Sequence, residues 1–269
     1  MATGGNEIDT SAAEAYEAFI VSAIFRPWAE LIVDLAAPKP GDRVLDVACG
    51  TGIGARIVAE RVAPDGKVTG LDIDPAMVEV ARDLAAGSAL ACDWQVASAL
   101  AMPFADDRFD LCLCLQGLQF FPDRGAGFAE CRRILRPDGR LFASLWLPIE
   151  DNKGHLALAR ALENQNVDSA PVRRPFSFAD AGEIRETAKE AGFRTVEVRT
   201  GERSARFRSI EGFIDSLAAG APSARHALVQ IPEDRRGDFV EEVKESLEAF
   251  VTENGLELPM RSHVVIATP

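Results

Sequence analysis

The sequence lacks an excess of basic side chains: 29 Lys and Arg stand against 42 Asp and Glu, so the formal net charge is −13 at pH 7. Proteins that hold a nucleic-acid backbone need a basic face. The charge therefore predicts no nucleic-acid partner. The chain also lacks an apolar run close to the roughly 20 residues that span a bilayer, and its first residues lack the basic and apolar segments of a signal peptide. We expect a cytoplasmic protein without a membrane span.

Cysteine and histidine are scarce. The five Cys include no CxxC pair, and their odd number gives no disulfide framework. Scattered free thiols are typical of a reducing cytoplasm. Only three His are present, and they are not clustered with Cys in the way that a zinc site requires. The sequence therefore predicts no metal site.

One stretch, VLDVACGTG at residues 44–52, organises the chain. Residues 44–47 have the branched apolar pattern of a buried strand, and the pattern turns helical from Ile53. Gly50, Gly52 and Ala55 fit the G-x-G-x-x-A fingerprint of dinucleotide-binding loops. A carboxylate at Asp46 would repel a pyrophosphate, however, and suits the ammonium end of a zwitterionic, cationic ligand. The loop alone leaves both ligands open.

The strands that follow predict a doubly wound α/β sheet. Residues 67–71 form a second strand that ends at Asp72, whose two carboxylate oxygens suit the two hydroxyls of a ribose. Residues 111–115 are apolar without alternation, so both faces of that strand should be covered by helices. Strands and helices alternate five times, and 269 residues allow one α/β domain with an elaboration.

Four ordered motifs carry a family resemblance: VLDVACGTG, GLDIDPAMVEVAR, ASALAMPF and FDLCLCLQGLQFFPD. They resemble those of class I S-adenosylmethionine-dependent methyltransferases, in particular the type 11 enzymes similar to those of ubiquinone and menaquinone biosynthesis. The resemblance covers about residues 40–147. It implies a Rossmann-like sheet of seven strands, mostly parallel, in which the last strand (256–268) runs antiparallel between the fifth and the sixth. The implied cofactor is S-adenosylmethionine, with S-adenosylhomocysteine as the product.

The resemblance also implies which residues bind the cofactor. Two positions depart from the family pattern. Ala48 replaces the usual first glycine, and Ser98 stands where an acid usually accepts from the adenine amino group. The implied contacts are Asp46, Ala48, Cys49, Gly50, Gly52, Asp72, Ile73, Met77, Ser98, Ala99 and Gln116.

Outside the motifs the chain divides into further parts. Residues 1–37 are predicted to form N-terminal helices that fold over the cofactor as a lid, through Tyr16 and Trp28, although plain packing against the sheet is equally open. Residues 38–208 and 255–269 form the Rossmann-like domain. Residues 209–254 are predicted to be an inserted helical cap.

The predicted activity is methyl transfer to a small-molecule acceptor, with O-methylation favoured over C- or N-methylation. His155 follows the fifth strand and is the candidate base, while Gln119 and Phe176 are candidate acceptor contacts. Two other functions stay open: an NAD(P)-dependent oxidoreductase, and a non-catalytic protein of the same fold that binds a metabolite. The oligomeric state, monomer or homodimer, is also open.

Overall fold

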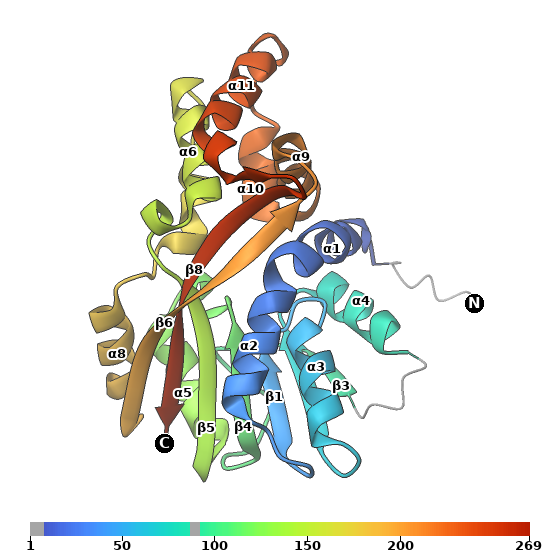
Figure 1. Cartoon of the computed structure of the whole chain (residues 1–269). Coiled ribbons are helices and arrows are strands. Elements are labelled where there is room, and N and C mark those ends of the chain that lie inside the picture. The colour runs from blue at the N-terminus through green and yellow to red at the C-terminus, as the bar shows by residue number, and fades with distance from the viewer. Residues whose placement is uncertain (1–7, 87–91) are drawn as a thin grey trace, which may run out of the picture.

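The structure is a computed structural model that describes residues 8–86 and 92–269. Residues 1–7 of the predicted N-terminal helical segment lie outside the described residues. Within the described part, eight strands form one sheet, of which seven follow the order β3-β2-β1-β4-β5-β8-β6 (Figure 1). The strands are β1 (Arg43–Val47), β2 (Lys67–Asp72), β3 (Cys92–Val96), β4 (Phe109–Leu115), β5 (Leu135–Trp146), β6 (Thr195–Phe207), β7 (Val251–Thr252) and β8 (Gly255–Thr268).

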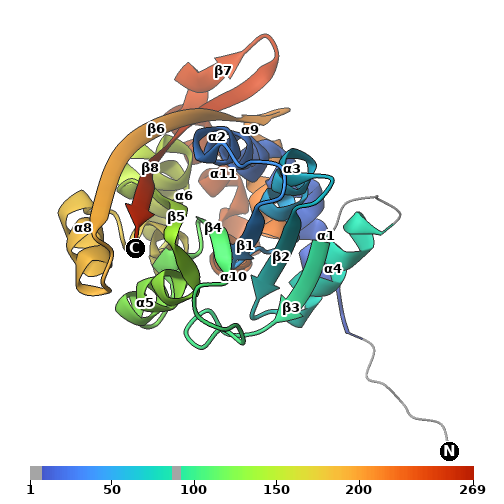
Figure 2. The same cartoon turned by 90° about the horizontal axis from the view of Figure 1, so that it is seen from below.

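Helices cover both faces of the sheet, as the continuous apolarity of β4 predicts. Alternate residues of a strand point to opposite faces: Leu111 and Leu113 of β4 belong to one core, and Cys112 and Cys114 belong to the other. The first core includes α2 and α3, and the second includes α5 and α8 (Figure 2). The helices beside the sheet are α2 (Arg26–Ala36), α3 (Ile53–Val62), α4 (Pro75–Ala85), α5 (Arg124–Ile134) and α8 (Ala181–Glu190).

Strand β8 runs antiparallel to both of its neighbours, β5 and β6. The other main strands pair in parallel. The predicted fold class, a mostly parallel seven-stranded sheet with one antiparallel strand, is therefore confirmed, and the short β7 adds a hairpin to β8. Residues 136–139 bulge between the pairs Phe109–Leu135 and Leu111–Arg140, where the sequence predicts a turn.

The N-terminal helices run without interruption from Ser11 to Ala36. The middle part, η1 (Glu17–Phe25), is wound as a π-helix between α1 (Ser11–Tyr16) and α2. At its end the amide of Arg26 donates to the carbonyl of Val21, five residues back. Pro27 follows this π-helical segment inside the continuous helix, so the helix lacks the one bond that an N–H at this position would donate to the preceding turn.

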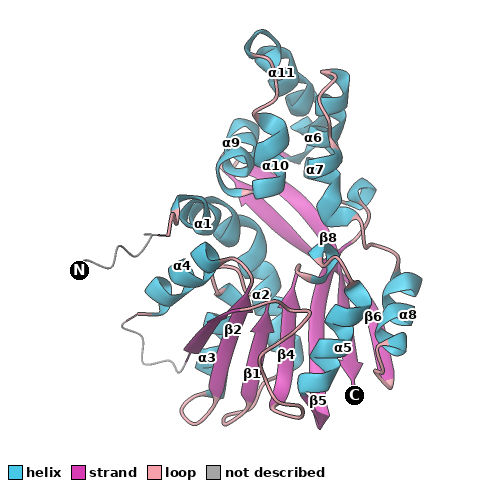
Figure 3. Ribbon diagram, turned by 180° about the vertical axis from the view of Figure 1, so that it is seen from behind, coloured by secondary structure: helices cyan, strands magenta, loops and turns pink. Residues whose placement is uncertain are grey.

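A second group of helices stands beyond the carboxyl ends of the strands, where the long β6 and β8 extend (Figures 1 and 3). It includes α9 (Ile210–Gly220), α10 (Pro222–Leu228) and α11 (Arg236–Leu247), which come from the stretch predicted as a cap. It also includes α6 (Lys153–Asn164) and α7 (Ala170–Arg173), which pack on α11 and α10. The division into lid, sheet domain and cap stays a prediction.

The remaining helical elements are single turns. Pro171 and Pro175 each occupy the first turn of a short helix, α7 and η4. No helix in the described ranges has both the length and the apolarity for a membrane crossing. The single turns are η2 (Leu118–Phe120), η3 (Ile149–Asp151), η4 (Arg174–Phe176), η5 (Glu233–Arg235) and η6 (Glu248–Phe250).

Candidate functional site

A cavity of about 1020 Å³ lies at the carboxyl ends of the parallel strands. Its floor comes from the loops after β1, β2, β3 and β4, and its roof from the N-terminal helices and from α7, α9 and α10. The carboxyl edge is where open α/β sheets bind their ligands. The volume lies at the upper end of the usual range for ligand sites, so one space can hold two small molecules.

Ten of the predicted site residues line this cavity. Their roles remain predictions, but the fold brings them together from segments up to 139 positions apart. They are Tyr16, Ala48, Gly50, Asp72, Ile73, Met77, Ser98, Ala99, Gln116 and His155.

The glycine loop after β1 is built from left-handed backbone. Ala48, Gly50 and Gly52 have φ of 54°, 54° and 84°. The chain can therefore turn sharply before α3, and Gly50 presents its bare backbone to the cavity. Ala48 adopts a conformation that disfavours a side chain. This is a physical reason why glycine is the usual residue at that position. Gly52 has a different role, because a Cβ there would lie 2.3 Å from the ring of Trp94.

Asp46 does not line the cavity. Its side chain is 1 % exposed, and its Oδ2 accepts from the amide of Ala55 at the start of α3, with an N···O distance of 2.8 Å. Its Oδ1 is buried without a partner in the described structure. Burial raises the pKa of Asp46 to about 7, against the opposing effect of the amide. The carboxyl group thus fixes the turn between β1 and α3, and its predicted contact with a ligand ammonium is not matched by its position.

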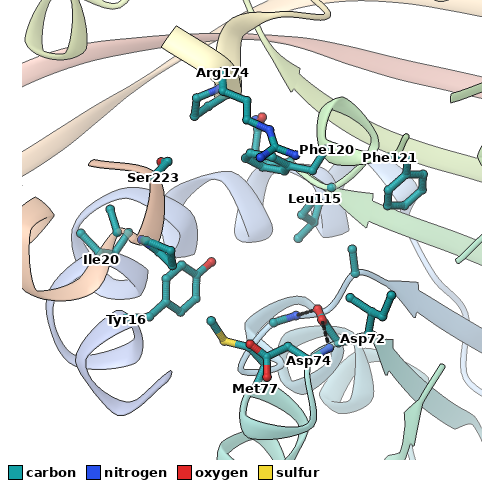
Figure 4. A pocket seen from close by; sticks show the side chains of 18 of the residues that line it. Tyr16, Ile20, Asp72, Asp74, Met77, Leu115, Phe120, Phe121, Arg174 and Ser223 are labelled. Atoms are coloured by element: carbon teal, nitrogen blue, oxygen red, sulfur yellow. Dashed lines mark hydrogen bonds between the residues drawn. The ribbon is translucent and has the colours of Figure 1, made fainter. Parts of the chain in front are cut away.

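Asp72 lies at the end of β2 and faces the cavity (Figure 4). Its Oδ2 accepts from the amide of Gly50 at 2.8 Å, and its Oδ1 accepts from the amide of Asp74 at 3.0 Å. Each carboxylate oxygen has two acceptor directions, so one on each remains for a ligand. Burial raises the pKa of Asp72, and these amides oppose the shift. This carboxylate fits a pair of ribose hydroxyls.

Apolar side chains and one hydroxyl surround Asp72. Ile73 is 72 % exposed, and both it and Met77 border the cavity. The Oγ of Ser98 accepts from the amide of Leu100 at 3.2 Å, so the hydroxyl that replaces the usual acid stabilises its own turn. Ile73 and Met77 can pack against a flat ring, and Ser98 offers it an uncharged polar group. These residues, with Gly50 and Asp72, fit an adenosyl group.

Tyr16 closes this end of the cavity from the side of the N-terminal helices. Its ring lies over Gly50, where an added Cβ would approach Tyr16 to 3.6 Å. Burial and the charge of Asp72 both raise the pKa of the Tyr16 phenol, so it stays neutral. The next residue, Glu17, accepts from Thr51 of the glycine loop at 2.5 Å and pairs with Arg56 of α3 at 2.8 Å. These contacts tie the helix to the loop, and the sequence patterns gave no signal for them.

Three further residues that were predicted to contact the cofactor do not line the cavity. Trp28 is 1 % exposed and packs edge-on against Trp146, with ring centroids 5.9 Å apart. Cys49 and Gly52 belong to the loop but face away from the cavity, since Cys49 is buried near Gly70 and Gly52 near Trp94. The position of Trp28 favours packing over a lid contact.

A buried polar network borders the cavity after β4. Gln116 has φ of 56° and borders the cavity. Its Nε2 donates to Ser262 of β8 at 2.9 Å, and its Oε1 accepts from Gln119 at 3.1 Å. Gln119 is 3 % exposed and does not line the cavity. It therefore orients Gln116, and its predicted contact with the acceptor is not matched by its position.

His155 faces the cavity from α6 in an aromatic box. The centroids of Phe176 and Phe213 lie 5.1 and 6.1 Å from its ring. Burial lowers the pKa of His155 to about 4, and Nδ1 has no partner among the described residues. The imidazole is therefore neutral at pH 7 and only weakly basic. Phe176 does not line the cavity, because it packs behind His155 and against Trp146.

Much of the acceptor end is not predictable from the sequence. Phe120 and Phe121 stand in one of the four ordered motifs, but their direction into the cavity appears only in the fold (Figure 4). Most of the others come from helical segments whose sequence patterns gave no signal, and Leu115 and Trp146 come from the ends of β4 and β5. The missed lining residues include Ile20, Ile24, Phe25, Leu115, Trp146, Arg174, Leu217, Pro222 and Ser223.

The strand order and the site at its carboxyl edge define a Rossmann-like methyltransferase fold. The structure is similar to the YcgJ protein of Bacillus subtilis, with a TM-score of 0.60, 18 % identity, and coverage of 89 % of this chain and 97 % of that one. It is also similar to phosphoethanolamine N-methyltransferase 2 of Haemonchus contortus, crystallised with S-adenosylhomocysteine, with a TM-score of 0.61, 20 % identity, and coverage of 97 % and 58 %. The [4+2]-cyclase SpnF shares the fold at a TM-score of 0.56, 18 % identity, and coverage of 91 % and 81 %.

Residues 45–143 match the methyltransferase domain model of type 11. This stretch of the chain is therefore similar to a methyltransferase domain. Over 119 residues it is 41 % identical to a 2-phytyl-1,4-naphtoquinone methyltransferase of Synechococcus elongatus, covering 44 % of this chain and 51 % of that one. Over 139 residues it is 37 % identical to the ubiquinone/menaquinone biosynthesis C-methyltransferase UbiE of Stenotrophomonas maltophilia, covering 50 % and 55 %. The chain spans about half the length of these curated relatives.

Proposed function

We propose that the protein transfers the methyl group of S-adenosylmethionine to an apolar small molecule. The observation that carries the proposal is one continuous cavity with two unlike ends. Asp72, Gly50 and Met77 border the end that suits an adenosyl group, and Ile20, Leu217 and Trp146 belong to an apolar end. Methyl transfer needs donor and acceptor in contact and in line, and positioning supplies much of its rate.

When bound, S-adenosylmethionine would supply a methyl group already activated by a sulfonium. The chain's own task is to hold and enclose the reactants. Asp72 and Gly50 would fix the ribose and the loop, while Tyr16 would cover them. Leu115 and Phe120 would exclude water from the reacting atoms.

We further propose carbon as the accepting atom, in an electron-rich ring such as that of a quinol. The preference for O-methylation has no support among the relatives, which include a C-methyltransferase and a naphthoquinone methyltransferase by name. Removing the proton of a phenol, with a pKa near 10, is a poor task for a histidine whose pKa is about 4. A ring carbon can attack while its hydroxyl keeps its proton, and the cationic ring then gives up a very acidic proton. The weakly basic His155 can accept that proton.

The test is turnover with methyl-¹³C-labelled S-adenosylmethionine and a panel of naphthols, naphthohydroquinones and their acidic derivatives. Carbon NMR distinguishes a ring methyl from an O-methyl group. We expect a ring methyl, and a large loss of kcat in His155→Phe with the affinity for S-adenosylhomocysteine retained. An O-methyl product would contradict the proposed atom.

Two other functions have definite tests. The similarity to a [4+2]-cyclase means that the fold alone does not define methyl transfer. Binding of S-adenosylhomocysteine without turnover of any panel member would favour a non-catalytic or differently catalytic protein. Binding of NAD or NADP in its place would favour the oxidoreductase.

A further inference from the structure

The end of the cavity that lies away from Asp72 carries a few polar groups beside its apolar side chains. Arg174 belongs to η4, while Ser223 and His226 belong to α10. Helices α7 and α10 pack against each other, so these groups share one wall. In Figure 4 the side chain of Arg174 reaches into the cavity from the side opposite Asp72 and Asp74.

Arg174 is the one Lys or Arg among the described residues that line the cavity. No ion pair and no side-chain hydrogen bond of its guanidinium occurs within the described ranges. The neighbouring Arg173 differs, since it pairs with Glu163 at 2.8 Å. A chain with a net charge of −13 offers many acids, yet none lies within ion-pair distance of Arg174 among the described residues. The carboxyl group of Asp168 also lines the cavity, but its Oδ1 accepts from the amide of Ala170 at 2.9 Å.

We propose that Arg174 binds an anionic group of the methyl acceptor, so that the acceptor is an apolar, ring-bearing acid; this inference rests on the proposed function. A guanidinium presents a planar fork of donors that matches carboxylate or phosphate oxygens. The hydroxyl of Ser223 can donate a further hydrogen bond from the same wall. The walls between the two ends are apolar and accept the ring.

The charges also orient the acceptor. Asp72 and Asp74 at the donor end repel an anion, and Arg174 at the other end attracts it. The acidic group therefore points away from the donor, and the opposite side of the ring faces it. Arg174 lies outside residues 45–143, the part that matches the family model, so the relatives' substrates do not define this end.

The test is calorimetric binding to the full chain saturated with S-adenosylhomocysteine. The probes are 6-hydroxy-2-naphthoate, its neutral amide 6-hydroxy-2-naphthamide, and 2-naphthyl phosphate. We expect the naphthoate or the phosphate to bind at least tenfold more tightly than the amide, and the better of the two identifies the anionic group. Arg174→Gln should reduce that preference to less than twofold and leave the affinity for S-adenosylhomocysteine within twofold. Arg225→Gln, which removes a nearby cation of α10 that does not line the cavity, should keep the preference.

Three results would overturn the inference: equal affinity for acid and amide, a preference that survives Arg174→Gln, or no saturable binding of either anion up to millimolar concentration. If S-adenosylhomocysteine itself fails to bind, the proposed function fails. If it binds and the anions do not, the inference about Arg174 fails alone. Because Arg174 is exposed and unpaired within the described structure, we expect its variant to melt at the wild-type temperature, which the same samples can verify.

Discussion

The two ends of the cavity are built in different ways. The donor end is shaped largely by backbone. Three residues of one loop have positive φ, and Asp72 accepts hydrogen bonds from two backbone amides. At the acceptor end, side chains from the N-terminal helices, α6, α9 and α10 meet. A site made of turns depends on residues close together in the chain, whereas a site made of helix faces depends on packing. Substitutions in the helices can therefore change the ligand of the acceptor end while the donor end keeps its own ligand.

The largest expected effect is at the donor end. Gly52→Ala places a Cβ 2.3 Å from Trp94 in a residue with φ of 84°. Overpacking costs about 1–3 kcal/mol, and left-handed backbone adds about 1–2 kcal/mol. Urea denaturation should show a loss of about 2–5 kcal/mol. Gly41→Ala is the matched control, because φ there is 90° but nothing lies within 4 Å. Equal losses in the two variants would contradict the contact with Trp94.

A substitution of Asp46 tests whether the buried charge at the donor end lowers the free energy of unfolding. Its pKa of about 7 in the folded chain lies above its ordinary value, so the folded state binds more protons and loses stability as pH rises towards 7. Asp46→Asn, which cannot ionise, should therefore gain stability relative to wild type as pH rises, by at most about 4 kcal/mol above pH 7. Denaturation at pH 4.5, 6 and 8 measures this. A difference that does not change with pH would refute the shifted pKa.

Asp72 tests whether the two ends are independent. Asp72→Asn removes the charge and one acceptor, so we expect the affinity for S-adenosylhomocysteine to fall by about 1–3 kcal/mol. Asp74→Asn is the control, because Asn caps a helix as well as Asp does and this residue borders the same end. Binding of 6-hydroxy-2-naphthoate to each variant, saturated with S-adenosylhomocysteine, should not weaken, because each substitution removes a charge that repels the anion. An unchanged affinity for S-adenosylhomocysteine in Asp72→Asn would contradict the proposal that Asp72 binds the ribose.

The smallest effect is expected at Ala48. Glycine relieves the left-handed backbone by about 1–2 kcal/mol but adds freedom to the unfolded chain, which costs about 0.4–1 kcal/mol. Ala48→Gly should therefore be more stable by about 0.5 kcal/mol in urea denaturation. Destabilisation beyond about 1 kcal/mol would show that the methyl group of Ala48 has a packing role.

The sequence predicted the donor end better than the acceptor end for a physical reason. Glycine turns, the acid after β2 and the capping pair Asp74–Pro75 act locally, so their order in the chain reveals them. The family resemblance implied that the last strand runs antiparallel between the fifth and the sixth, and this was confirmed. The inward direction of Arg174 depends on how η4 packs against α7 and η2, and the buried position of Gln119 depends on Gln116 and Ser262. No local pattern encodes such contacts.

Asp46 shows the opposite case. The local pattern correctly marked Asp46 as a residue of the glycine-loop motif, but the ligand contact predicted for its carboxylate does not match its position in the structure. Its place at the end of β1 predicted a ligand contact from charge alone. In the structure its Oδ2 accepts from the amide of Ala55. The first amides of a helix have no partner within the helix, so the buried carboxyl group supplies one. Residue type and spacing identify a motif, but only the surrounding atoms decide which of its members face the ligand.

The most direct test of the central claim is titration of the purified wild-type chain with S-adenosylhomocysteine, with NAD and NADP in parallel. If the donor end is an adenosyl site that selects the methyl donor, S-adenosylhomocysteine should bind with micromolar affinity and one-to-one stoichiometry, and neither dinucleotide should bind. Tighter binding of a dinucleotide, or no binding of S-adenosylhomocysteine, would contradict the account.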